Sequence, residues 1–143
     1  WRTAWTAQAQ IGAGHYVEAM SYLPQETVSY LQIESPYNLA RYLIAWAMLL
    51  LSDRELVIVA WPDGTHVPLD AETRSTQVVR LLAMIRSDRR CDPSTLNQAR
   101  RLLARAIGET GIHADVDSVH IRPASSIDEI ARELLNIRLA EGQ

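Results

Sequence analysis

The residues with the clearest chemical potential are arginines gathered in one segment of the chain. Between Arg74 and Arg105 the sequence holds eight arginines against two aspartates, a net charge of +6. Guanidinium groups form bidentate hydrogen bonds with carboxylates and phosphates, and contacts with a phosphate backbone supply affinity without sequence specificity. We therefore take six arginines as candidate contacts with nucleic acid or an acidic partner: Arg86, Arg89, Arg90, Arg100, Arg101 and Arg105.

The charge of the whole chain argues against a simple polyanion binder. Its 143 residues contain 14 basic and 17 acidic side chains, a net charge of −3. No aromatic residue lies among the arginines, whereas single-strand binders usually combine the two. The alternative interpretation is a solvated face that pairs with carboxylates elsewhere in the chain or in a partner. Every basic residue is an arginine, so no lysine amine is available for Schiff-base or general-base chemistry.

Two tryptophans near the start of the chain form the second candidate surface. Trp1 and Trp5 lie one helical turn apart and share a face if this stretch is helical. Such a pair belongs either to the core or to an interface with another subunit, where tryptophan often carries binding energy. We expect Trp1 and Trp5 to be buried by this chain or by a protein partner.

Catalytic and metal-binding patterns are weak. If residues 113–120 are extended, His113, Asp115 and Asp117 share one face, but their spacing matches no strong metal motif. Cys91 is the only cysteine, and the neighbouring Arg89 and Arg90 would lower the pKa of its thiol. A site combining Cys91 with a histidine remains an alternative; the candidates are His66, His113 and His120. The sequence predicts no cofactor and no metal site.

A long apolar run must position these residues. Residues 42–51 carry no charge, and the run is shorter than the ~20 residues that a membrane span needs. Ser35 and Pro36 suit a cap and a first helical position. A helix that is apolar on nearly every side is buried, so we predict a central helix over about 36–52 with other elements around it.

The remaining patterns predict shorter elements around that helix. Three helices are expected before it, over about 1–10, 15–23 and 24–33. The β-branched run from residue 56, a Pro-Asp-Gly-Thr turn and a return with Pro68 indicate a small antiparallel hairpin over about 56–69. Helices over 71–86 and 93–107 follow caps at Asp70 and Asp92. Residues 111–122 suggest a third strand, and 127–140 a last helix.

These elements predict a mostly α (α+β) fold in a single domain over residues 1–143. We find no signal-peptide pattern in residues 1–14, and a single cysteine fits the cytoplasm. The function that fits best is a non-enzymatic subunit or adaptor of a larger assembly, such as a nucleoprotein or phage-type complex, with protein subunits as partners. The alternatives are a direct DNA- or RNA-binding module and a small enzyme with a Cys/His or His/Asp site.

Overall fold

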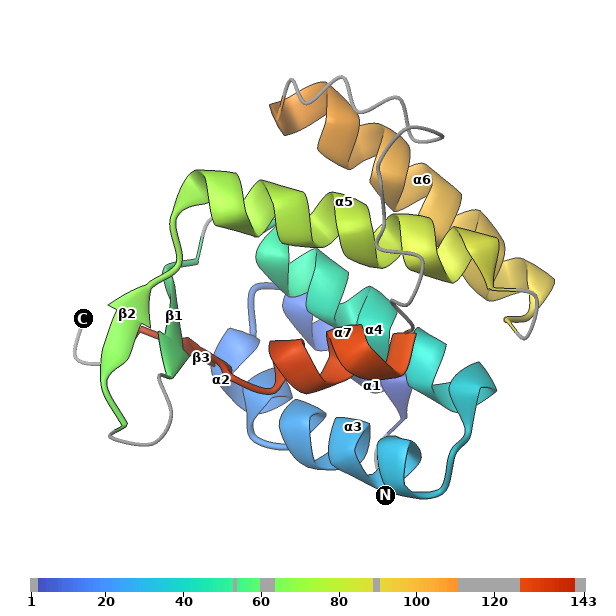
Figure 1. Ribbon diagram of the computed structural model, residues 1–143, viewed down its shortest axis with the longest axis horizontal. Coiled ribbons are helices and arrows are strands. Elements are labelled where there is room, and N and C mark those ends of the chain that lie inside the picture. The colour runs from blue at the N-terminus through green and yellow to red at the C-terminus, as the bar shows by residue number, and fades with distance from the viewer. Residues whose placement is uncertain (1–2, 53, 60–63, 89–90, 111–126, 141–143) are drawn as a thin grey trace.

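The computed structural model describes residues 3–52, 54–59, 64–88, 91–110 and 127–140. The described part of the chain is mostly helical with a small β element, as the sequence predicts, and the strands form a three-stranded antiparallel sheet that includes the predicted hairpin (Figure 1). The expected strand over 111–122 lies outside the described residues.

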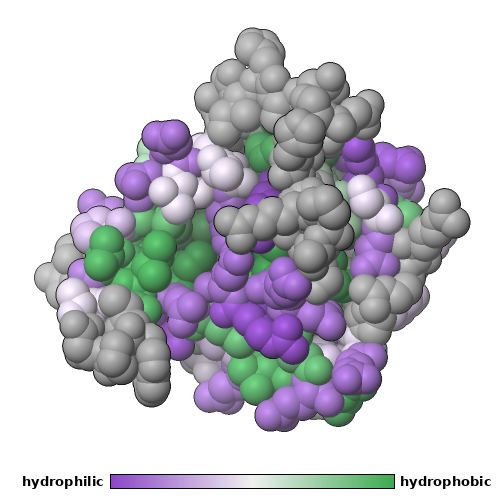
Figure 2. Space-filling model, in the orientation of Figure 1, coloured by the Kyte–Doolittle hydropathy of each residue, from purple (hydrophilic) through white to green (hydrophobic). Residues whose placement is uncertain are grey.

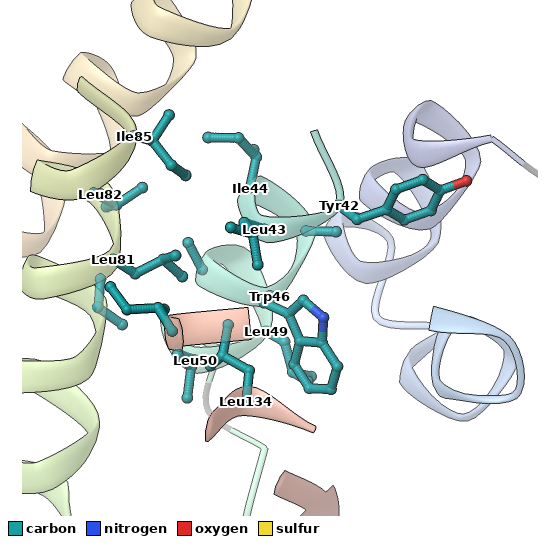
Figure 3. Close-up of a cluster of buried hydrophobic side chains, with 14 of the residues drawn as sticks. Tyr42, Leu43, Ile44, Trp46, Leu49, Leu50, Leu81, Leu82, Ile85 and Leu134 are labelled. Carbon is teal, nitrogen blue, oxygen red and sulfur yellow. The ribbon is translucent and has the colours of Figure 1, made fainter. Parts of the chain in front are cut away.

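The central helix is α4, Pro36–Leu50, and it contacts helices on all sides. From Leu39 to Leu50 every side chain is buried except those of Arg41 and Met48, which are partly exposed. Figure 3 shows Leu81, Leu82 and Ile85 facing α4 on one side, with Leu134 packed near Leu50. The predicted buried central helix is thus confirmed. Ser35 occupies the cap position, but its side chain makes no cap hydrogen bond and instead accepts one from Asn38 Nδ2 at 2.9 Å.

Three helices precede α4: α1 (Ala4–Gly12), α2 (Tyr16–Met20) and α3 (Leu23–Gln32). Helices α1 and α3 pack against α4, and α2 packs against both of them (Figure 1). Thr3 caps α1 by accepting a hydrogen bond from the Thr6 amide at 3.2 Å. Thr27 of α3 is fully buried, and its hydroxyl accepts the indole N–H of Trp46 at 3.0 Å. This bond satisfies the one polar atom of a tryptophan that is otherwise enclosed in the core.

Helices α5 (Ala71–Ser87) and α6 (Pro93–Thr110) form an antiparallel pair above α4. Both predicted caps are present: Asp70 Oδ1 accepts the Thr73 amide at 2.6 Å, and Asp92 Oδ1 accepts the Thr95 amide at 3.2 Å. Arg74 Nη1 and Nη2 donate at 2.9 Å to the carbonyls of Ser52 and Arg54, tying α5 to the segment that follows α4.

The sheet has the order β2-β1-β3, with β1 (Leu56–Val59) between β2 (His66–Pro68) and β3 (Ile137–Leu139). The expected hairpin is present, with Val59 opposite His66 and Val57 opposite Pro68.

The prediction of a helix over 127–140 is wrong at its second half. Helix α7 spans Ile127–Leu134, and the chain then turns so that Ile137 and Leu139 pair with Ile58 and Leu56. The alternating burial of Ile137, Arg138 and Leu139 fits a strand, because their side chains point to opposite faces.

Candidate binding surface

The described arginines of the basic segment differ in their contacts and exposure. Arg74 and Arg80 hold the fold together: Arg74 binds two carbonyls, and Arg80 Nη1 lies 2.7 Å from Glu133 Oε2 of α7. Arg100, Arg101 and Arg105 are exposed on α6, whereas Arg86 is half-buried at the end of α5. Arg89 and Arg90 lie outside the described residues.

The exposed side of α6 follows from its helical pattern. Thr95, Ala99, Leu103 and Ala106 are buried against the domain, whereas Arg100, Arg101 and Arg105 lie on the other side of the helix and are exposed. Neither the Arg100 side chain nor the Arg101 side chain makes a hydrogen bond or ion pair within the described part of the chain. The sequence contains no acidic residue from Pro93 to Gly108. This side of α6 is therefore basic, although the chain as a whole is acidic.

A second group of polar side chains joins the start of α6 to α4. Arg41 Nη2 lies 3.2 Å from Asp92 Oδ2 and donates to the Tyr37 hydroxyl at 2.9 Å. The Tyr37 hydroxyl in turn lies 3.3 Å from Asp92 Oδ2. Partial burial opposes ionisation of Asp92, but hydrogen bonds from Thr95 and Arg41 outweigh it and hold the pKa of this carboxyl below its usual range. Asp92 is thus both the cap of α6 and the anionic partner of Arg41.

Aromatic rings flank Arg41. Its guanidinium carbon lies 4.5 Å from the centre of the Tyr37 ring and 5.9 Å from that of Trp5. Both rings are among the exposed large side chains, Trp5 at 48% and Tyr37 at 42%. Trp5 is therefore not a core residue, and its exposure leaves its predicted contact with a partner untested. Trp1 lies outside the described residues.

A hollow of about 310 Å³ opens beside this group of side chains. Three aromatic residues and three polar ones line it: Trp5, Tyr30, Tyr42, Thr3, Asn38 and Arg41. The rings of Tyr30 and Tyr42 stack with centres 5.2 Å apart. Burial, followed by the nearby Glu26 carboxylate, raises the pKa of Tyr42 to about 12, so this phenol stays protonated at neutral pH.

The sequence did not single out Arg41 or Tyr37 as site residues. A signal was nevertheless present, because Arg41 is the only charged residue between Pro36 and Leu51 in an otherwise apolar helix. A charge in that setting is rarely buried unless it has a partner. Its partner, Asp92, is 51 positions away, and only the folded chain brings the two together.

A further hollow, of about 410 Å³, lies at the sheet and is lined by Leu56, Val57, Pro68, Leu69, Glu55 and Arg74, with Ala140 at its edge. Figure 2 shows hydrophobic surface over β1 and β2, where Val67 is 48% exposed.

The geometry gives little support to a catalytic site formed by Cys91 and a histidine or by histidine and aspartate residues. Cys91 is buried just after α5, whereas His66 is exposed on β2 just before it, so the two lie at opposite ends of a 17-residue helix (Figure 1). His113, Asp115, Asp117 and His120 lie outside the described residues. Within the described ranges, no three histidine, cysteine, aspartate or glutamate side chains are grouped so that they could hold a metal ion.

Comparisons with models of known protein families, with curated proteins and with solved structures find no significant match to this chain. In the described part of the chain, every helix is too short or too polar to cross a bilayer.

Proposed function

We propose that this chain is a non-enzymatic binding subunit of a larger, cytoplasmic nucleoprotein-type assembly, and that α6 contacts the nucleic acid. The observation that carries this proposal is the exposed basic side of α6, formed by Arg100, Arg101 and Arg105 in a stretch without acidic residues. The guanidinium groups of Arg100 and Arg101 donate no hydrogen bond to another described residue, so their N–H groups are available to a partner.

The partner that suits this surface best is a phosphate backbone. Arg101 and Arg105 are separated by about one helical turn, so their Cα atoms lie roughly 6 Å apart along the helix axis and both side chains lie on the same side of α6. Regularly spaced cations of this kind neutralise successive phosphates and release counterions. An acidic protein surface is the alternative partner, because it offers carboxylates to the same guanidinium groups.

Charge-reversal variants test the proposal. We expect the Arg100→Glu/Arg101→Glu double variant to bind a fluorescein-labelled 12-nucleotide strand at least about tenfold more weakly than the unaltered chain, by fluorescence anisotropy. The matched control is Arg54→Glu/Arg132→Glu, which changes the net charge equally at two exposed arginines outside α6. The control double variant should bind more tightly than the α6 variant.

Salt gives a second measure of the same contact. Three phosphate contacts on a single strand predict that log K falls with log salt with a slope of about −2. Absence of binding at micromolar protein, binding that does not respond to salt, or equal losses in the two double variants would overturn the proposal.

A further inference from the structure

The aromatic residues that the basic segment lacks in sequence are supplied in space by α1 and α4. Trp5 and Tyr37 flank Arg41, and Arg41 is bonded to Asp92 at the first turn of α6. The two exposed rings therefore lie beside the beginning of the helix whose later turns carry the exposed arginines. Proteins that bind single-stranded nucleic acids combine aromatic rings, on which bases stack, with a basic groove that follows the backbone.

A partly buried hydrogen bond links α1 to α6. Gln98 Nε2 of α6 donates to Gln8 Oε1 of α1 at 3.0 Å, and Gln8 Nε2 donates to the Arg41 carbonyl at 3.3 Å. Trp5 lies one turn before Gln8, while Arg101 lies one turn after Gln98, and residues three apart share a helix side. Trp5 and Arg101 are therefore each about one helical turn from this hydrogen bond, along α1 and α6 respectively.

The surface has a length and a charge that suit a short strand. From Asp92 to Arg105 the helix rises about 20 Å, enough for a few nucleotides. Helix α1 and residues 93–108 contain no acidic residue, and Asp92 is paired with Arg41. The carboxylate whose charge acts on the hollow is that of Glu26, near Tyr42.

We propose that the hollow lined by Trp5, Tyr30 and Tyr42 receives one unpaired base of a single-stranded nucleic acid, whose backbone continues along α6 past Arg101 and Arg105. This inference rests on the proposed function, and it adds the kind of nucleic acid and the residues that hold a base. The hollow's volume of about 310 Å³ is at the lower end of the range for small-ligand sites, which is suitable for one planar ring. Thr3, Asn38 and Arg41 supply polar atoms at its walls.

A single strand is favoured over a duplex because the bases of a duplex are already stacked and paired. It is favoured over an acidic peptide because a carboxylate does not stack on aromatic rings, whereas every base has a π-face that stacks on tryptophan or tyrosine. An acidic protein partner is supported instead if neither strand binds at micromolar protein.

The experiment compares strands that differ only in their bases. A labelled 12-nucleotide thymidine strand and a strand of equal length with abasic residues carry the same phosphates. We expect the unaltered chain to bind the thymidine strand about 5- to 150-fold more tightly, the range for one stacked base. Trp5→Leu should reduce this ratio towards one, Trp5→Phe should retain part of it, and Val17→Ala, at another exposed apolar residue, should leave it unchanged.

The outcomes separate this inference from the proposed function. Equal binding of the two strands by the unaltered chain, with loss in the Arg100→Glu/Arg101→Glu variant, overturns the base site but supports the phosphate contact. No binding of either strand overturns both. If Trp5→Leu fails to fold, photocrosslinking of the unaltered chain to a 5-iodouracil strand decides: an adduct on Trp5, Tyr30 or Tyr42 supports the site, and adducts confined to other residues overturn it.

Discussion

Asp92 has two structural roles that different substitutions can separate. Its Oδ1 accepts the Thr95 amide at the start of α6, while its Oδ2 lies 3.2 Å from Arg41 Nη2. Asparagine caps helices about as well as aspartate, so Asp92→Asn should keep the cap and lose the charge opposite Arg41. Asp92→Ala should lose both.

The loss of stability expected for Asp92→Asn depends on how deeply the ion pair between Arg41 and Asp92 is buried. The side chains of Arg41 and Asp92 are 24% and 15% exposed. Exposed pairs contribute about 0–1 kcal/mol, whereas breaking a fully buried pair costs about 3–5 kcal/mol. For this intermediate case we expect Asp92→Asn to lower the free energy of unfolding by about 1–2 kcal/mol. The lost cap should add about 1 kcal/mol in Asp92→Ala.

Asp70 provides the matched control. It caps α5 in the same way, with the Thr73 amide 2.6 Å from Oδ1, but it is exposed and makes no ion pair with another described residue. The hydrogen bonds with Thr73 also lower the pKa of Asp70, so Asp70→Ala should lose both the cap and the charge, whereas Asp70→Asn should keep the cap and lose less stability than Asp92→Asn. Urea unfolding followed by tryptophan fluorescence measures all four variants.

The effect of Asp92→Asn should also depend on pH. The pKa of Asp92 is lower in the folded chain than in the unfolded chain, so its ionised form stabilises the fold above the unfolded value of about 3.9. This contribution is lost as the pH falls through the folded pKa. The difference between the unaltered chain and Asp92→Asn should therefore shrink on acidification. A difference that is the same at pH 7 and pH 2.5, or equal losses in Asp92→Asn and Asp70→Asn, would refute the assigned ion-pair role.

Two further substitutions, each paired with a control, test the core. Thr27→Val should lower the free energy of unfolding by about 1–3 kcal/mol, because it leaves the buried indole N–H of Trp46 without its acceptor, whereas Thr27→Ser should recover most of the loss in the same urea measurement. Leu134→Ala should cost about 2–5 kcal/mol by leaving a cavity where α7 meets α4, and thermal unfolding should show Arg132→Ala on the exposed side of α7 within about 0.5 kcal/mol of the unaltered chain.

Features set by neighbouring residues could be predicted from the sequence. Asp70 and Asp92 precede their helices and cap them, and the uninterrupted apolar run after Arg41 produces a helix buried on all sides. The exposure of Arg100 and Arg101 follows from the 3.6-residue spacing of the apolar positions around them. Each of these signals lies within a few residues of the structure it specifies.

Features set by distant residues could not be predicted from the sequence. The positions Leu134, Leu135, Ile137 and Leu139 satisfy a helical period or a strand period equally well over so short a run. Pairing with β1 decides in favour of a strand for the last two, and that partner lies about eighty residues earlier. The hydrogen bond between Gln8 and Gln98 spans 90 positions, so no local pattern in the sequence indicates that α1 contacts α6.

The position of β3 also affects how the chain can fold during its synthesis. The apolar strand β1 needs Ile137–Leu139 on one side, and those residues leave the ribosome about eighty residues after it. At about 5–20 residues per second this delay is roughly 4–16 s. During that time the backbone groups on one edge of Leu56–Val59 have no strand partner, and the α4 surface that α7 covers is open.

An unpaired apolar strand edge can pair with another chain. Nascent copies on one messenger RNA are therefore most prone to associate between the emergence of β1 and that of β3. Slow translation of residues 60–136 would lengthen this period, whereas a chaperone that shields Leu56–Val59 would protect the chain during it.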